Sequence, residues 1–172
     1  MGPRARQIRP ETPADGPAVR ALTRAAFGRD DEAALVDRIR DRAADYAAFV
    51  AEAGGDVVGH LALSRVTLDP PAPGLTALGL APMAVAPEVQ RSGVGSALVR
   101  HALAWCRRSG VGAVFVLGHP TYYPRFGFEP AARYGIADEY GAPTEAFMVA
   151  ELTPGALADV VGTARYDPAL AG

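Results

Sequence analysis

The sequence predicts a mixed α/β fold. Its 172 residues alternate between segments with the apolar period of helices and segments with the apolar pattern of strands. Between Leu78 and Leu117 the order is strand, glycine-rich loop, helix and strand, which is a βαβ unit whose crossover should be right-handed. These observations predict one domain that contains parallel as well as antiparallel strand pairs.

Composition and charge exclude several classes of function. Hydrophobic residues make up 49% of the chain and charged residues 21%, as in ordinary globular domains. The net charge of −2 and the isoelectric point of about 5.9 give no electrostatic basis for binding nucleic acid or an anionic membrane. No apolar run is long enough to span a bilayer, and a single cysteine leaves no intrachain disulfide, so we expect a cytoplasmic protein.

The N-terminal part of the chain predicts one short strand and two helices. Residues 7–9 have strand character, and residues 12–15 form a capping box with a proline at the first helical position. The first helix should end at Gly28. Acidic residues 30–32 should open the second helix and complement its positive end. The expected buried faces are Val19, Leu22, Ala26 and Phe27 in the first helix, and Leu35, Val36 and Ile39 in the second.

The middle of the chain predicts a hairpin and then a strand with an interruption. Residues 49–51 and 57–58 flank a Gly-Gly-Asp turn, and the second strand continues towards Val66. Three prolines between Asp69 and Gly74 mark a loop. The next strand, residues 75–85, contains Pro82, which cannot donate a ladder hydrogen bond. We therefore expect a bulge or a splay near this proline.

A long helix and three strands complete the predicted elements. The helix after the glycine loop should end before Gly110, and its apolar stripe is Val94, Ala97, Leu98, Ala102 and Trp105. Residues 113–117 and 147–152 are expected as apolar strands, and residues 162–166 as an edge strand. Cys106 and Trp105 are interpreted as core residues without a catalytic role.

The loop Gln90-Arg91-Ser92-Gly93-Val94-Gly95 joins the interrupted strand to this helix. Such a loop directs a helix N-terminus at a pyrophosphate, because glycines allow close approach and the first-turn N–H groups are unpaired. The pattern alone is weak, since a second Gly-x-Gly at 110–112 fits a helix end. A dinucleotide-binding oxidoreductase is excluded by spacing, because Leu98 stands where the third glycine would fall.

The glycine loop becomes a specific signal when it is combined with the motifs before and after it in the sequence. It follows the interrupted strand, and Tyr123 stands four residues ahead of Gly127-Phe128. In this order and spacing the motifs resemble the GCN5-related N-acetyltransferase (GNAT) family, and residues 58–60 and 118–123 look most like its YhbS-like branch. The resemblance covers about residues 7–152 of a single domain, 1–172, with 153–172 as a C-terminal tail. It implies a three-layer α-β-α fold whose twisted, mostly antiparallel sheet splays between two central parallel strands.

The resemblance implies an acyltransferase that moves an acetyl group from acetyl-CoA to a primary amine of a small molecule or a peptide terminus. The pantetheine chain would pair with the backbone of Met83, Ala84 and Val85 where the strands part. The N–H of Val85 would also stabilise the thioester oxygen. The pyrophosphate would contact the loop and the first helical turn, through Gln90, Arg91, Ser92, Gly93, Val94, Gly95 and Ser96.

Tyr123 is the expected general acid for the leaving thiolate, with Tyr122 as the alternative, because a phenol pKa of about 10 suits a thiol of about 8.5. The competing interpretation is that both tyrosines only pack in the core. The interrupted strand contains no carboxylate that could serve as the general base. The remaining candidates for this role are His60, His119 and Glu145, of which His119 is the strongest. Without a strong base, an α-amine, about 10% neutral at pH 7, is an easier acceptor than a lysine, about 0.04% neutral.

One alternative function stays open at this point. A non-catalytic acyl-CoA-binding or sensing module on the same fold would explain the missing base, although it would not need Tyr123. We expect no metal, no nucleic acid and no membrane partner, and the resemblance is compatible with a homodimer. The acceptor pocket should lie between the N-terminal helices and the C-terminal strands, where no motif identifies the amine.

Overall fold

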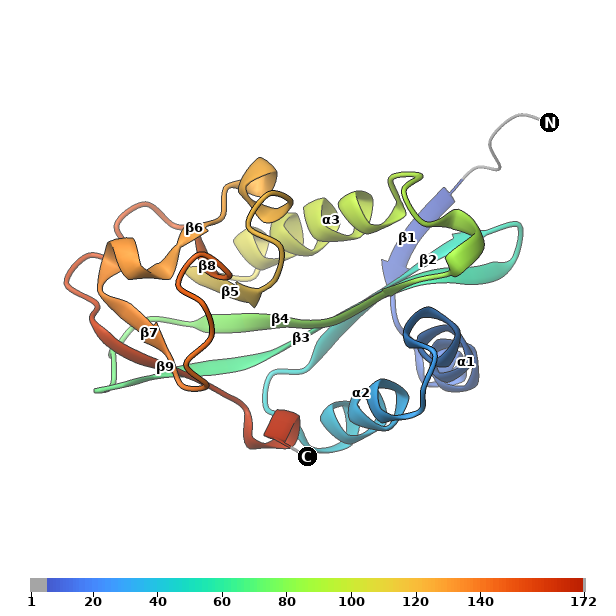
Figure 1. Ribbon diagram of the computed structural model, residues 1–172, viewed down its shortest axis with the longest axis horizontal. Coiled ribbons are helices and arrows are strands. Elements are labelled where there is room, and N and C mark those ends of the chain that lie inside the picture. Colours follow the sequence, from blue (N-terminus) through green and yellow to red (C-terminus); the bar gives the residue numbers. More distant parts are fainter. Residues whose placement is uncertain (1–5, 172) are drawn as a thin grey trace.

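The computed structural model describes residues 6–171, so the basic residues 1–5 lie outside the described part of the chain. Within these residues a nine-stranded sheet forms the central layer. Helix α3 (Val94–Arg108) covers one face, and helices α1 (Gly16–Phe27) and α2 (Asp31–Arg42) cover the other (Figure 1). The expected layers of helix, sheet and helix are therefore confirmed.

The sheet is mostly antiparallel, with a parallel pair at its centre. Strands β1 to β4 form consecutive antiparallel pairs, β4 pairs with β5 in parallel, and β8 joins β5 to β6 in antiparallel pairs. The sequence prediction of a mixed sheet is confirmed. The bounds are β1 Arg6–Pro10, β2 Ala47–Ala53, β3 Asp56–Asp69, β4 Ala77–Val85, β5 Ala113–Leu117, β6 Glu129–Pro130 and β8 Phe147–Glu151.

The C-terminal strand was placed wrongly from the sequence. Strand β9 (Gly162–Tyr166) pairs with β3 in antiparallel and with β7 (Ile136–Asp138) in parallel, so it lies inside the sheet and not at an edge. Strands β6 and β7 were not predicted, because two or three residues are too few to show an apolar period. They are placed by their pairing partners, which are distant in the sequence.

Strands β4 and β5 part after a short paired stretch. Their pairing runs only from Ala77 opposite Ala113 to Gly79 opposite Phe115. On its other side β4 stays paired with β3, with a register shift between Leu80 and Met83. The interruption expected at Pro82 is therefore confirmed. It leaves one edge of β4 open to a ligand beyond Gly79.

Helix α1 ends as predicted, but the capping box opens a 3₁₀ turn, Pro13–Asp15, which leads into α1 at Gly16. The capping box is present, because the backbone N–H of Thr12 donates to the Asp15 carboxylate at 2.7 Å. Gly28 ends the helix with φ of 74°. Phe27, expected in the buried face, is 41% exposed, because it lies five residues after Leu22 and thus about 140° around the helix.

Among the described helices, none is long and apolar enough to be a membrane span.

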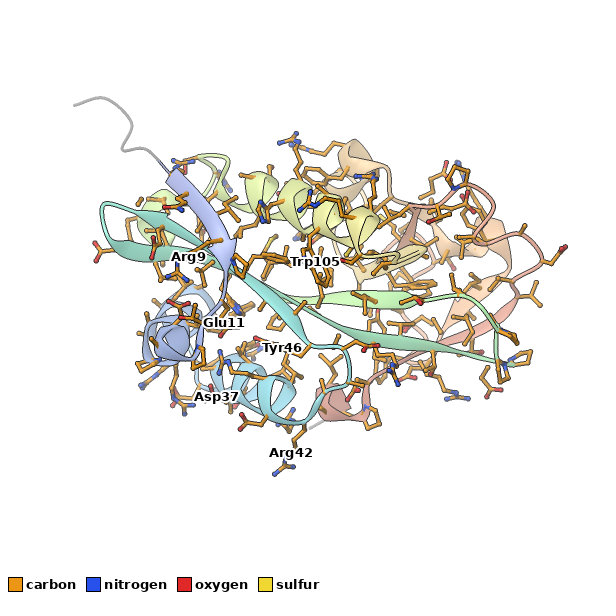
Figure 2. All side chains as sticks on the ribbon, turned by 180° about the vertical axis from the view of Figure 1, so that it is seen from behind. Arg9, Glu11, Asp37, Arg42, Tyr46 and Trp105 are labelled. Atoms are coloured by element: carbon orange, nitrogen blue, oxygen red, sulfur yellow. The ribbon has the colours of Figure 1, made fainter. Side chains whose placement is uncertain are left out.

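A buried polar cluster holds the α1/α2 face together. The Glu11 carboxylate accepts hydrogen bonds from Arg40 of α2 and from the Tyr46 hydroxyl, both at 2.5 Å. His60 of β3 lies 3.4 Å from the same carboxylate. Glu11 and Tyr46 lie on this side of the sheet, whereas Trp105 of α3 lies on the other (Figure 2). Burial and the bond to Glu11 raise the pKa of Tyr46 well above its ordinary value.

Helix α3 lies unusually close to the sheet at Gly59 of β3. A Cβ atom added at Gly59 would come within 2.7 Å of Val94 Cγ1 and 2.9 Å of Leu98 Cδ1. Glycine is therefore required for this approach, which places the first turn of α3 beside the C-terminal half of β4. Cys106, on the last turns of the same helix, is buried, and burial raises its pKa to about 12. Its expected role as a core residue is confirmed.

We expect Gly59→Ala to destabilise the protein by about 2 kcal/mol, because a stiff valine and a packed leucine must both move. For a domain of this size that corresponds to a fall of roughly 4–8 °C in the melting temperature. Thermal unfolding followed by circular dichroism measures it. Gly16→Ala is the matched control, since a Cβ there meets nothing within 4 Å. An equal melting temperature for Gly59→Ala and wild type would show that the helix does not depend on this contact.

Candidate active site

A pocket of about 690 Å³ lies between the C-terminal half of β4, the start of α3 and the segment after β5. Its volume falls in the range of sites for small ligands and cofactors. Three separate parts of the sequence form it, and they include most of the residues singled out from the sequence. The lining residues are Met83, Val85, Gln90, Arg91, Gly93, Gly95, Ser96, His119, Tyr122, Tyr123 and Arg125.

The loop before α3 presents an anion site to this pocket. Arg91 and Gly93 adopt left-handed φ angles of 61° and 91°, and Gly93 caps the helix. The Ala97 N–H donates to the Gly93 carbonyl at 3.0 Å, so the N–H groups of Val94, Gly95 and Ser96 precede the first intrahelical bond. Free N–H groups and the positive end of the helix dipole attract a phosphate group.

Two further arginines lie close to this anion site. Arg6 of β1 donates to the Ser92 carbonyl at 2.7 Å and to its hydroxyl at 3.0 Å, and so fixes the loop from outside. The guanidinium of Arg125 stacks on the Tyr122 ring at 4.8 Å. Arg91 lines the pocket itself, so three arginines place positive charge around the loop. Neither Arg6 nor Arg125 was predicted from the sequence.

The backbone of β4 turns alternate residues to the pocket. The Ala86 N–H donates to the Val58 carbonyl at 2.9 Å, so Ala86 and Val58 form a hydrogen-bonded pair of the β3–β4 ladder. Hydrogen-bonded pairs alternate along an antiparallel ladder, so Ala84 and His60 form the next one. By the same alternation the backbone groups of Met83 and Val85 point to the open side. The Gln90 side chain donates to the Val85 carbonyl there at 3.1 Å, whereas the Ala84 backbone is engaged with β3.

Tyr122 and Tyr123 form an edge-to-face pair with ring centroids 5.1 Å apart, and they differ in environment. The Tyr122 hydroxyl lies 3.0 Å from the Ser96 hydroxyl, so it is already hydrogen-bonded to α3. Tyr123 is buried against Phe128, and its ring occupies the space that a Cβ of Gly118 would need, 2.3 Å from one ring carbon. Burial, with a smaller effect of Tyr122, raises the pKa of Tyr123 to about 12.

The two histidines considered as bases lie in different environments. His119 is exposed and lines the pocket, whereas His60 is fully buried on the α1/α2 face beside Glu11. His60 is therefore removed from the candidate site, and Glu145 does not line this pocket. None of the described lining residues is acidic. In residues 6–171 no three His, Cys, Asp or Glu side chains gather as a metal site.

Three of the residues predicted to bind the donor do not line the pocket. Ala84 is turned away by the strand alternation described above, Ser92 contacts Arg6, and the Val94 side chain is buried against β3 at Gly59. Val94 still belongs to the anion site, through its backbone N–H. Arg125 lies within the segment between Tyr123 and Gly127, so the motif itself offered a signal for it. Arg6 offered none, because it is 86 residues from Ser92.

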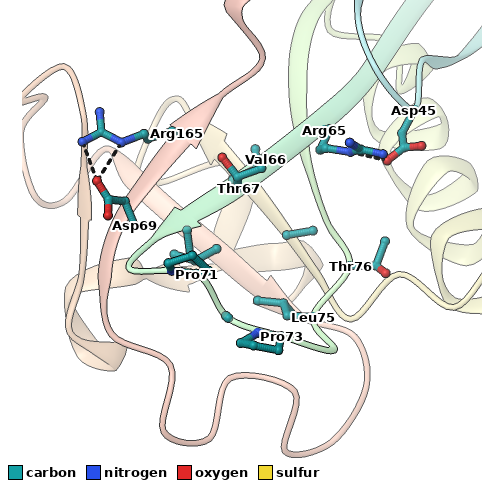
Figure 3. Close-up of a pocket in the computed structure, with 13 residues that line it drawn as sticks. Asp45, Arg65, Val66, Thr67, Asp69, Pro71, Pro73, Leu75, Thr76 and Arg165 are labelled. Atoms are coloured by element: carbon teal, nitrogen blue, oxygen red, sulfur yellow. Dashed lines mark hydrogen bonds and ion pairs between the residues drawn. The ribbon is translucent and has the colours of Figure 1, made fainter.

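A second large groove, of about 640 Å³, lies at the turn between β3 and β4 (Figure 3). Its charged residues are already paired: Arg65 with Asp45 at 2.8 Å, and Arg165 with Asp69 at 2.9 Å. None of the residues predicted to carry chemistry lines it. The pocket beside α3 is therefore the stronger candidate.

Comparison with known families identifies the family to which the chain belongs. A family model described as the acetyltransferase (GNAT) domain matches residues 7–131. The chain belongs to the GNAT acetyltransferase family. The resemblance inferred from the sequence motifs is confirmed.

Two GNAT proteins show how close this similarity is. The uncharacterized N-acetyltransferase YhbS of Escherichia coli is 36% identical over 160 residues, which cover 92% of this chain and 95% of that protein. Its crystal structure in complex with CoA has a TM-score of 0.91 and covers 100% of this chain and 94% of its own. A GNAT family acetyltransferase from Brucella melitensis in complex with acetyl-CoA is 31% identical, has a TM-score of 0.78 and covers 96% of this chain and 98% of its own.

We expect Arg6→Gln to weaken acetyl-CoA binding about fivefold, because the loop loses two bonds from a charged donor, worth about 1 kcal/mol at an exposed position. Isothermal titration calorimetry measures the dissociation constant. Arg107→Gln, at the far end of α3, removes the same charge without touching the loop and serves as the control. Equal weakening by both variants would mean that only the overall charge matters.

Proposed function

We propose that this protein transfers an acetyl group from acetyl-CoA directly to the primary amine of a small molecule or a peptide terminus. One observation supports this most strongly: the open edge of β4, the N-terminus of α3 and Tyr123 line a single pocket. The first suits an amide-rich chain, the second a pyrophosphate, and the third a leaving sulfur. In acetyl-CoA the amide-rich pantetheine chain lies between the pyrophosphate and the thioester sulfur, so one extended molecule could contact all three.

The donor is proposed from the chemistry of the pocket. Met83 and Val85 offer an unpaired strand edge, to which an extended pantetheine chain can add as a peptide does. The N–H groups at the start of α3, with Arg91 nearby, suit the pyrophosphate. Two similar proteins were crystallised with CoA and acetyl-CoA, which supports the same donor here.

Bound acetyl-CoA would supply an activated thioester carbonyl to the amine. A C–N bond forms, the C–S bond breaks, the amine loses one proton, and coenzyme A leaves as its thiol. The Val85 N–H, on the open side of β4, is placed to donate to the carbonyl oxygen as charge develops on it. No reorganisation of the strand is needed, because the ladder with β3 already fixes this N–H.

Tyr123 is proposed to donate a hydrogen bond to the leaving sulfur. Its pKa of about 12 keeps the phenol protonated through the whole range in which enzymes work. Full proton transfer to a thiolate of pKa about 8.5 would be uphill by roughly 3.5 units, or about 5 kcal/mol. Stabilisation by a hydrogen bond is therefore a better role for Tyr123 than complete protonation.

The acceptor is proposed to arrive as a neutral amine. None of the described residues that line the pocket is acidic, and His119, the one histidine there, is exposed at its edge. An amine with a pKa near 8 is neutral in about 10% of molecules at pH 7, about 250 times more than a lysine side chain. We therefore propose an amine of low pKa, such as an α-amine, with His119 as a secondary proton acceptor.

We expect Tyr123→Phe to lower kcat about 100-fold while the dissociation constant for acetyl-CoA stays within twofold, because the lost bond forms chiefly to the developing thiolate. Tyr122→Phe should reduce kcat much less, since its hydroxyl already bonds Ser96. Release of free CoA from acetyl-CoA, measured across a panel of amines, gives kcat, and isothermal titration calorimetry gives the dissociation constant.

An unchanged kcat in Tyr123→Phe would remove Tyr123 from the reaction. Tight acetyl-CoA binding without turnover on any amine would favour the acyl-CoA-binding module instead, a function that the absence of an acidic lining residue would explain.

A further inference from the structure

A smaller cavity, of about 170 Å³, opens on the α1/α2 side of the splayed strands. Leu80 is the last residue of β4 before its register shift, Ala81 lies within the shift, and Leu117 ends β5. Leu170 packs in the same cluster as Ile39 of α2, which places the cavity on the face opposite α3. The six lining residues are Leu80, Ala81, Leu117, Tyr140, Tyr166 and Leu170. The cavity thus borders the gap from the side that the donor pocket leaves free.

The lining of this cavity is entirely apolar and aromatic. Tyr140 and Tyr166 stack with ring centroids 6.0 Å apart and planes 21° apart. Tyr140 is 56% exposed although it stacks on Tyr166, and Leu117 is 39% exposed, so two large side chains of the lining keep apolar surface in contact with solvent. A dry cavity of about 150 Å³ accommodates a benzene ring. The cavity is therefore of the right size for one aromatic ring or one branched alkyl group.

The charge beside the cavity is negative. Asp138 and Glu139 directly precede Tyr140, and Asp138 lies opposite Ala164 on β9, two residues before Tyr166. One Asp138 oxygen is buried without a hydrogen-bond partner among the described residues, as is the Tyr166 hydroxyl. Burial first, and then Asp138, raise the pKa of Tyr166 well above its ordinary value. A ligand carboxylate would be repelled here, whereas an amine would not.

We propose that the acceptor is an α-amine that carries a ring-sized apolar side chain and no free carboxylate, as in an amino acid amide or a peptide that begins with an aromatic residue. This inference rests on the proposed acetyl transfer. The side chain would fill the cavity between Tyr140, Tyr166 and Leu117, and the amine would reach the gap beside Ala81. The low pKa of an α-amine also compensates for the missing base.

A long acyl chain of the donor is the competing occupant of the cavity. It would gain the same apolar burial, but it would gain nothing from Asp138 and Glu139. Their negative charges lie close to Tyr140 and Tyr166, which favours an occupant that carries an amine. The two occupants predict different substrate dependence, because one changes the choice of amine and the other the choice of thioester.

The test compares four acceptors at fixed acetyl-CoA: phenylalaninamide, glycinamide, phenylalanine and the side chain of a blocked lysine. We expect kcat/KM for phenylalaninamide to exceed that for glycinamide about 30-fold, with phenylalanine and lysine both weaker than phenylalaninamide. Tyr140→Ala should reduce the ratio of phenylalaninamide to glycinamide about tenfold. Val161→Ala, which truncates a 58% exposed residue away from the cavity, should leave this ratio unchanged.

Equal rates for phenylalaninamide and glycinamide, or a ratio that Tyr140→Ala does not change, would overturn the inference while acetyl transfer stands. A preference for longer acyl-CoA donors that Tyr140→Ala abolishes would assign the cavity to the donor instead. If no amine reacts, the proposed function has failed. Calorimetry of phenylalaninamide with the CoA-bound protein then tests whether the cavity binds the aromatic side chain. Binding that Tyr140→Ala abolishes would support the cavity assignment, and absence of binding in wild type would contradict it.

Discussion

The structure depends on a backbone constraint: β4 has to satisfy its hydrogen-bonding groups on both sides, but β5 leaves it after Gly79. On the β3 side the ladder continues past the bulge to Val85. On the other side, the N–H and C=O groups of Met83 and Val85 face an open gap, where the Gln90 side chain reaches only the Val85 carbonyl. A ligand with alternating amide groups can complete this edge without a particular side chain on β4. This explains how Met83 and Val85, whose side chains are apolar, can form a binding site through their backbone groups.

The remaining parts of the site follow from the way α3 is held against the same strands. Gly59 lets Val94 and Leu98 approach β3, so the first turn of α3 opens beside the free edge of β4. Arg6 then fixes the loop before α3 from the neighbouring β1. The anion site and the strand edge thus share one rigid frame. A change in the packing of α3 should therefore weaken binding of both the pyrophosphate and the pantetheine chain of the donor.

The two sides of the gap have different chemistry. The α3 side carries arginines and free N–H groups, suited to an anionic donor, whereas the α1/α2 side carries the Tyr140–Tyr166 pair with carboxylates nearby. Donor and acceptor would therefore approach the thioester from opposite faces of the sheet. A change at Tyr140 would then alter the proposed acceptor site without disturbing the loop before α3.

Local patterns predicted most of the residues that line the pocket beside α3, because the motifs that contain them are short. The loop 90–95, Pro82 and the Tyr123 motif each combine a few adjacent residues, and the structure brings them to one pocket. The acceptor side could not be predicted in this way. Leu117, Tyr140 and Tyr166 come from separate segments, and two of them depend on strands β7 and β9, which the sequence either missed or placed at an edge. Arg6 and Ser92 likewise meet only through the tertiary fold.

Amide hydrogen exchange, resolved by residue and measured with and without acetyl-CoA, tests the central claim most directly. If the donor completes the open edge of β4, exchange at the Met83 and Val85 amides should slow by about tenfold or more at saturating acetyl-CoA. The Ala84 amide, already bonded to β3, is the internal control and should change much less. Equal protection of all three amides, or protection confined to other parts of the chain, would contradict the account.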